Sequence, residues 1–145
     1  MIKGSCVCGG VKFKIEKVVA LTHCHCSVCR KESRASFATF AHVRRERFRL
    51  VSGADLINPG YEWTPGHARS FCSRCGSPAP KYIEATRMVS VPACLLDDDP
   101  HVRPSMHVFT SSKAAWVELN DKLQKYDKWV PGFVPADLAS KSPGT

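Results

Sequence analysis

Residues 24–29 read CHCSVC, residues 6–8 read CVC and residues 72–75 read CSRC. These three motifs hold all but one of the eight cysteines, and Cys94 stands alone. A tight turn of two or three residues brings neighbouring thiolates into one coordination sphere, and the glycines beside the motifs relieve the backbone there. The spacing therefore predicts that these cysteines bind metal and do not form disulfides.

The composition is that of one folded domain. Of the 145 residues, 43% are hydrophobic and 23% are charged. The N-terminal MIKGSCVCGG lacks the apolar core and cleavage site of a signal peptide, and no apolar run approaches the roughly 20 residues that cross a membrane. We expect a cytoplasmic protein without a membrane partner, whose thiols stay reduced and available to metal. A single zinc-binding β domain is expected over residues 1–133, followed by a frayed tail over 134–145.

The chain is basic, with a formal net charge of +8. That charge treats every cysteine as neutral, so thiolate ligands would remove part of it. The run RRERFR at 44–49 alternates, which favours one solvated strand face over a nucleic-acid patch. We therefore expect a small anionic ligand and no nucleic-acid partner.

Six short runs carry the pattern or composition of β-strands, with Pro and Gly between them at the spacing of an all-β domain. The runs are residues 10–15, 37–43, 47–53, 81–84, 88–92 and 106–109. Strands and helices do not alternate, so a parallel sheet is not expected. The pattern predicts a mainly β fold.

One helix is expected near the C-terminal end of the domain. Ser111 or Ser112 can cap its start, and Trp116, Leu119 and Leu123 follow at helical spacing. This pattern predicts a helix on the sheet edge, with Trp116 packed in the core. A further helical turn is expected after the CHCSVC motif.

Counting ligands divides the clustered cysteines unequally. A tetrahedral structural zinc needs four ligands, and the first and third motifs supply them: Cys6, Cys8, Cys72 and Cys75. The remaining Cys24, Cys26 and Cys29 form a set with an open fourth position, which is typical of a zinc that acts on a substrate. Because sulfur suits this electron-rich, borderline-soft centre, we infer a thiol substrate.

Spacing alone also allows a second arrangement, a zinc ribbon in which Cys26 and Cys29 pair with Cys72 and Cys75. The ribbon would leave Cys6, Cys8 and Cys24 without a site. His23 or His25 could complete a three-cysteine site, but an extended backbone would turn His25 away, and neither is expected to be a ligand. Cys94 is predicted to be a small buried residue and His107 a structural histidine.

The same motifs resemble the glutathione-dependent formaldehyde-activating enzyme family, which also includes the centromere protein V group. The similar stretches are GSCVCGGVKF at 4–13, CHCSVCRK at 24–31, FCSRCGSP at 71–78, LLDDDP at 95–100 and HVFTSSKAAW at 107–116. The resemblance implies an Mss4-like fold of several small curled antiparallel sheets with one or two short helices, stapled by zinc. It also implies a structural zinc on the four-cysteine set and a catalytic zinc on Cys24, Cys26 and Cys29.

The resemblance implies a carbon–sulfur lyase reaction that joins glutathione and formaldehyde into S-hydroxymethylglutathione. Zinc would hold the glutathione sulfur as a thiolate, which adds to the aldehyde carbon. The family usually has a glycine where this chain has Arg34, and a bulky cation at that position is expected to alter the pocket. The alternative is a non-catalytic zinc module that contacts nucleic acid or protein, in which the second zinc would be closed by a protein ligand.

Overall fold

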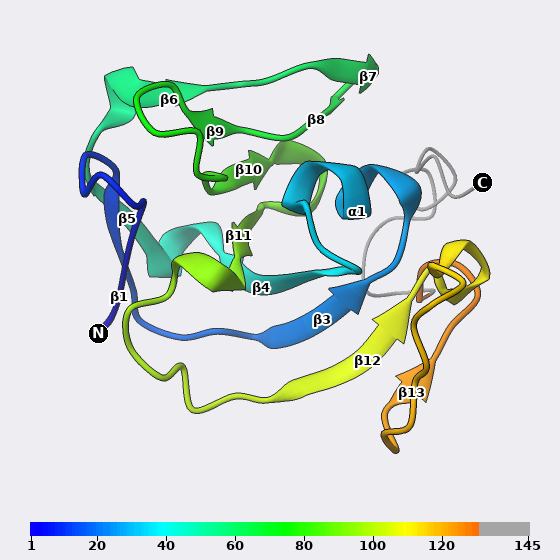
Figure 1. Cartoon of the computed structure of the whole chain (residues 1–145). Coiled ribbons are helices and arrows are strands. Elements are labelled where there is room, and N and C mark those ends of the chain that lie inside the picture. Colours follow the sequence, from blue (N-terminus) through cyan, green and yellow to red (C-terminus); the bar gives the residue numbers. More distant parts are fainter. Residues whose placement is uncertain (131–145) are drawn as a thin grey trace.

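A computed structural model of the protein describes residues 1–130 (Figure 1). The predicted tail at 134–145 lies outside these residues. The strands are short, and a single α-helix, α1 (Ser27–Ser33), occurs in the described part of the chain. The strands are β1 (Ile2–Ser5), β2 (Lys12–Ile15), β3 (Ala20–Cys24), β4 (Ala38–Arg44), β5 (Phe48–Ser52), β6 (Ile57–Asn58), β7 (Glu62–Thr64), β8 (His67–Ala68), β9 (Phe71–Cys72), β10 (Lys81–Ile83), β11 (Met88–Pro92), β12 (Pro104–Val108) and β13 (Gln124–Lys125).

The strands form two larger sheets and two short pairs. The order is β1-β2-β5 in a three-stranded sheet and β10-β11-β4-β3-β12-β13 in a six-stranded sheet. The pairs β6-β9 and β7-β8 lie at the top of Figure 1. The predicted mainly β fold of several small sheets with a short helix is thus confirmed, and each of the six predicted strand runs is a strand: β2, β4, β5, β10, β11 and β12.

One sheet is mixed, which the sequence did not predict. Strand β12 pairs in parallel with β3, so that His107 lies opposite His23, and β13 pairs in parallel with β12. After β11 the chain returns to the far side of β3 before it enters β12, and it therefore runs in the same direction as β3 (Figure 1). Neither segment alone shows which strand it will pair with, because β3 and β12 lie far apart in the sequence.

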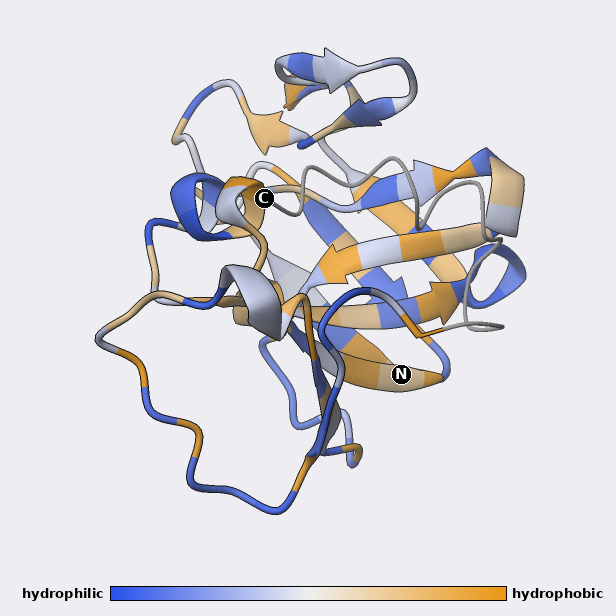
Figure 2. Ribbon diagram, turned by 90° about the vertical axis from the view of Figure 1, so that its right-hand side faces the viewer, coloured by the Kyte–Doolittle hydropathy of each residue, from blue (hydrophilic) through white to orange (hydrophobic). Residues whose placement is uncertain are grey.

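The main core joins the two larger sheets. Phe13 and Ile15 of β2 point inward, and Lys12 and Lys14 alternate with them toward the surface. The same core contains Val18, Leu21, Ala41, Val43, Val89, Val91 and Leu95. Figure 2 shows these hydrophobic segments along the stacked strands. Gly4 of β1 lies against the ring of Phe13, where a Cβ atom would come within 2.2 Å of a ring carbon. Strand β1 therefore lies so close to the ring of Phe13 on the neighbouring strand β2 that no side chain fits at this position.

The predicted helix over 111–123 is wrong. A 3-10 turn at Thr110–Ser112 is followed by turns and bends. The amides of Thr110 and Ser111 donate to the carbonyls of Tyr126 and Asp127 at 3.1 and 3.4 Å, so they face a distant segment and do not begin a helix. Trp116 is 75% exposed and does not pack in the core.

The helix that does form begins earlier than expected. Cys26 caps α1, because its Sγ accepts a hydrogen bond of 3.2 Å from the amide of Cys29.

The basic run at 44–49 is not one strand face, since a 3-10 turn at Arg45–Arg47 separates β4 from β5. Among residues 1–130, no helical segment has the length and hydrophobicity of a membrane span.

Candidate functional site

The first cluster brings together the cysteines of the first and third motifs. The Sγ atoms of Cys6, Cys8, Cys72 and Cys75 all lie within 4.8 Å of one another. Each motif folds as a tight turn: the amide of Gly9 donates to the carbonyl of Cys6, and the amide of Gly76 to that of Cys72, both at 2.8 Å. Both glycines have positive φ, 70° and 75°, a conformation that favours glycine.

The spacing of these sulfurs fits a tetrahedral zinc. Zinc–sulfur bonds of about 2.3 Å separate the sulfurs of a tetrahedron by about 3.8 Å. The Sγ atoms of Cys6 and Cys8 are 3.5 Å apart, and those of Cys8 and Cys72 are 3.9 Å apart. Hydrogen bonding with Ser77 lowers the pKa of Cys75 to about 5, which favours the thiolate that metal binding needs. The four residues therefore form a suitable donor set for zinc.

The second cluster is buried and has three members. The Sγ atoms of Cys24, Cys26 and Cys29 also lie within 4.8 Å of one another, and each residue is at most 5% exposed. Cys24 ends β3, Cys26 caps α1 and Cys29 lies in the first turn of α1. The zinc-ribbon alternative is therefore wrong, because Cys26 and Cys29 group with Cys24 and not with the CSRC motif.

Arg69, between β8 and β9, contacts the second cluster. Its Nη2 donates to Sγ of Cys29 at 3.1 Å, and its guanidinium lies over the rings of Phe40 and Trp63, 5.1 and 5.4 Å from their centroids. Hydrogen bonds from Cys24 and Cys26, and then the charge and hydrogen bond of Arg69, hold the pKa of Cys29 well below its usual value. Arg69 thus supplies positive charge where three thiolates and one zinc would carry a net negative charge.

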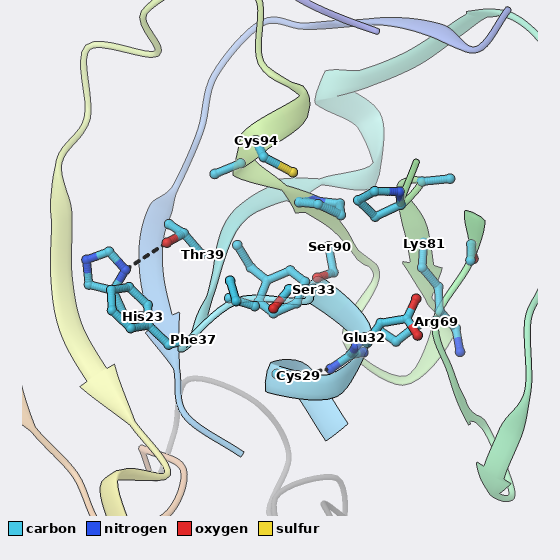
Figure 3. A pocket seen from close by; sticks show the side chains of 18 of the residues that line it. His23, Cys29, Glu32, Ser33, Phe37, Thr39, Arg69, Lys81, Ser90 and Cys94 are labelled. Carbon is cyan, nitrogen blue, oxygen red and sulfur yellow. Dashed lines mark hydrogen bonds between the residues drawn. The ribbon is translucent and has the colours of Figure 1, made fainter. Parts of the chain in front are cut away.

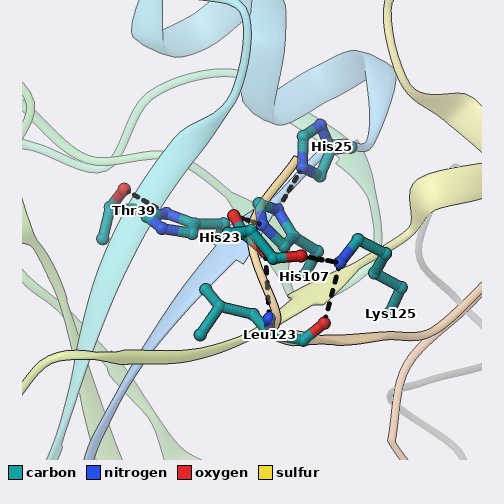
Figure 4. A network of polar contacts seen from close by, with 7 residues as sticks. His23, His25, Thr39, His107, Leu123 and Lys125 are labelled. Atoms are coloured by element: carbon teal, nitrogen blue, oxygen red, sulfur yellow. Dashed lines mark hydrogen bonds and ion pairs between the residues drawn. The ribbon is translucent and has the colours of Figure 1, made fainter. Parts of the chain in front are cut away.

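The histidines beside the second cluster belong to a separate network (Figure 4). Nε2 of His25 is 2.8 Å from Nδ1 of His107, whose Nε2 is 2.8 Å from the carboxylate of Asp121. A hydrogen bond from His107 lowers the pKa of Asp121 to about 2, so the ionised carboxylate accepts and Nε2 of His107 carries the proton. Nδ1 of His23 is 2.8 Å from the hydroxyl of Thr39. Neither His23 nor His25 joins the close group of sulfurs.

A cavity of about 550 Å³ adjoins the second cluster through Cys29. Its wall combines residues of α1, of β4 and β11, and of the segment from Arg69 to Lys81 (Figure 3). Arg69, Lys81 and Glu32 are the charged residues of this wall, and most of the others are apolar or small. Lys81 is held in place because its Nζ donates to the carbonyls of Gly66 and Ala68 at 3.2 and 3.0 Å. The cavity therefore has a charged region beside the cysteines.

Two predictions about single residues are wrong. Cys94 is exposed and lines the cavity, because it lies in a 3-10 turn after β11 where the chain leaves the sheet. Arg34 is exposed and does not line the cavity. It ends α1 in the left-handed conformation, with φ 56°, which explains why a glycine suits this position. Arg69, Lys81 and Glu32 were not identified from the sequence, because no motif contains them.

The fold and site define a small β protein with two cysteine clusters that could bind metal ions, one of them beside a cavity. The chain belongs to the glutathione-dependent formaldehyde-activating enzyme family, whose model matches residues 1–112. A Halomonas elongata protein named "Putative glutathione-dependent formaldehyde-activating enzyme" is 27% identical over 157 residues, covering 96% of this chain and 92% of its own. A crystal structure of a Rhodobacter sphaeroides protein shares 26% identity, with a TM-score of 0.55 over 70% of this chain and 91% of that chain.

Proposed function

We propose that the protein is a zinc-dependent enzyme of the carbon–sulfur lyase type that joins glutathione and a small aldehyde such as formaldehyde into S-hydroxymethylglutathione. One observation carries the proposal: among residues 1–130, a three-cysteine cluster that is one ligand short of a tetrahedral set reaches a cavity through Cys29. Zinc sites that act on a substrate keep such an open position, whereas structural sites are closed. The family and the name of the Halomonas relative support the same substrates.

In this proposal the two clusters have different roles. Cys6, Cys8, Cys72 and Cys75 hold a structural zinc that links the turn after β1 to β9. Cys24, Cys26 and Cys29 hold a second zinc, which would favour the ionised form of a substrate thiol at neutral pH. Both roles need reduced cysteines, which fits a cytoplasmic location.

The charged wall of the cavity suits glutathione, which has two carboxylates, one ammonium group and one thiol. Arg69 and Lys81 offer positive charge to the carboxylates, and Glu32 offers negative charge to the ammonium group. Arg69 also contacts Cys29, so a carboxylate that it binds lies close to the cysteine cluster. Binding at these groups would bring the thiol of glutathione to the open side of the cluster.

The reaction needs positioning more than acid–base chemistry. The sulfur of glutathione forms a bond to the aldehyde carbon, the carbonyl π bond breaks, and the proton released by the thiol reaches the carbonyl oxygen. The charged residues fix the thiol, and apolar residues such as Phe37 and Phe40 exclude water from the aldehyde. Holding the two reactants together is the contribution expected of this chain's residues.

The test is the cobalt-substituted protein titrated with glutathione. We expect the sulfur-to-cobalt absorption to change with glutathione but not with S-methylglutathione, which has no free thiol. Exchange NMR of glutathione with formaldehyde should show a rate above the uncatalysed one, and Cys24→Ser/Cys26→Ser/Cys29→Ser should lose this excess while it stays folded. A cobalt spectrum that glutathione leaves unchanged contradicts the proposal.

A further inference from the structure

The cavity is larger than the proposed reactants require. Formaldehyde is about the size of one or two water molecules, and glutathione is roughly ten times the size of a water molecule, or about 300 Å³. The cavity has about 550 Å³, which leaves space for roughly eight water-sized volumes beside glutathione, or about six once formaldehyde is also bound. This space exceeds what a one-carbon aldehyde can fill.

The charged residues occupy one end of the cavity, and the other end has no charged lining residue among those described (Figure 3). Figure 3 shows Arg69, Lys81 and Glu32 on one side of the cavity, and His23, Phe37 and Thr39 on the other. The ring of His23 packs edge-on against that of Phe37, with centroids 4.7 Å apart. The apolar residues Pro92, Ala93 and Pro104 also line the cavity.

The polar atoms at this second end already bond to one another. Nδ1 of His23 and the hydroxyl of Thr39 are 2.8 Å apart, so they satisfy part of each other's hydrogen-bonding capacity. An apolar group placed here would contact ring faces and proline and alanine side chains without leaving these atoms unpaired. A charged or strongly polar group would find no ion of opposite sign at this end among the residues that the structure describes, since their charged lining residues are Glu32, Arg69 and Lys81.

We propose that this second end binds the substituent of the carbonyl substrate, and that the preferred substrate is an aldehyde with an apolar group about the size of a phenyl ring. The inference rests on the proposed function and names its class of aldehyde. The chemistry is unchanged: the thiol sulfur bonds to the carbonyl carbon, the π bond breaks, and the thiol proton reaches the oxygen. No oxidant or reductant takes part.

Phenylacetaldehyde and acetaldehyde test this preference, because they differ by one phenyl group at the carbon beside the carbonyl. For each aldehyde, kcat/KM is measured with glutathione and divided by the rate constant of the uncatalysed reaction. We expect this quotient to be at least about 10-fold higher for phenylacetaldehyde than for acetaldehyde, since one buried methylene group alone can change kcat/KM about 10-fold. Ala93→Phe, which adds an aromatic ring to the apolar lining of the cavity, should lower this ratio at least about fivefold. Ala115→Phe, at an exposed position outside the cavity, should not change the ratio.

A binding measurement separates this inference from the proposed function. Phenylacetamide keeps the ring but does not take up a thiol as an aldehyde does, and we expect ligand-observed NMR to detect its binding to the wild type and weaker binding to Ala93→Phe. If phenylacetamide binds to the wild type and more weakly to Ala93→Phe, but no aldehyde reacts, the proposed function is wrong and the apolar binding region is supported. If formaldehyde and acetaldehyde react, but phenylacetaldehyde is not preferred and phenylacetamide does not bind, the inference is overturned and the proposed function stands.

Discussion

Replacing Arg69 by leucine should weaken metal binding at the three-cysteine cluster. Arg69 donates a hydrogen bond of 3.1 Å to Sγ of Cys29, and its guanidinium lies over the rings of Phe40 and Trp63. Leucine keeps an apolar side chain between these rings but removes the charge and the hydrogen bond. The change therefore acts on the metal site more than on the packing.

The size of the effect follows from the lost contact. A hydrogen bond to a charged group contributes about 1.5 to 3 kcal/mol, and loss of an outer partner of a metal ligand lowers metal affinity about 10- to 100-fold. We expect Arg69→Leu to raise the zinc dissociation constant of this site by that factor. The zinc dissociation constant of Arg69→Lys should lie between those of the wild type and Arg69→Leu, because lysine keeps the charge without the planar fork of donors.

Chelator competition measures both sites in one titration. The four-cysteine site should hold zinc equally well in wild type and Arg69→Leu, which provides an internal control. Arg74→Leu is the matched control for loss of an arginine, since Arg74 is exposed and lies within the CSRC turn of the other cluster. Unchanged zinc affinity of the weaker site in Arg69→Leu would refute the role given to Arg69.

Three further predictions concern stability, measured by denaturant unfolding. His42 is buried beside Thr22, and burial lowers its pKa from 6.5 to about 4. As the pH falls, the unfolded chain therefore takes up a proton at His42 before the folded chain does. Between pH 6.5 and 4, the wild type should lose up to about 3 kcal/mol of its free energy of unfolding that His42→Gln does not lose. Arg34→Gly should stabilise the protein by about 1 kcal/mol, because glycine suits φ 56° at the end of α1, whereas Arg34→Ala should give no gain. Gly4→Ala should cost about 1 to 3 kcal/mol through the clash with Phe13, and Val7→Ala, at a position 91% exposed, should cost little.

Local patterns predicted six of the thirteen strands in the described part of the chain, and they predicted the helices poorly. Strands such as β2 and β11 show their alternation in the sequence because one face is buried. The segment 111–123 has helical spacing, but its first amides bond to residues 126 and 127, a contact that no local pattern reveals. Helix α1 has no amphipathic stripe, and its start depends on a cysteine side chain acting as the cap.

Ligand counting predicted how the cysteines divide into two clusters, but it did not predict the cavity beside the second cluster. The division into four and three cysteines follows from coordination number and spacing, and the sulfurs group in that way. Arg69 and Lys81 were missed because the wall of the cavity combines segments that lie far apart in the sequence, among them α1, β4 and β11. Cys94 was expected to be buried because its neighbours are apolar, but its turn places it at the rim of the cavity.

Zinc stoichiometry tests the central claim most directly. We expect two zinc ions per chain in the wild type, and one in a folded Cys24→Ser/Cys26→Ser/Cys29→Ser variant, with circular dichroism as the check on folding. Loss of both ions or unfolding in that variant would contradict the division into a structural and a working cluster. A wild type that holds a single zinc even in excess metal would contradict it as well.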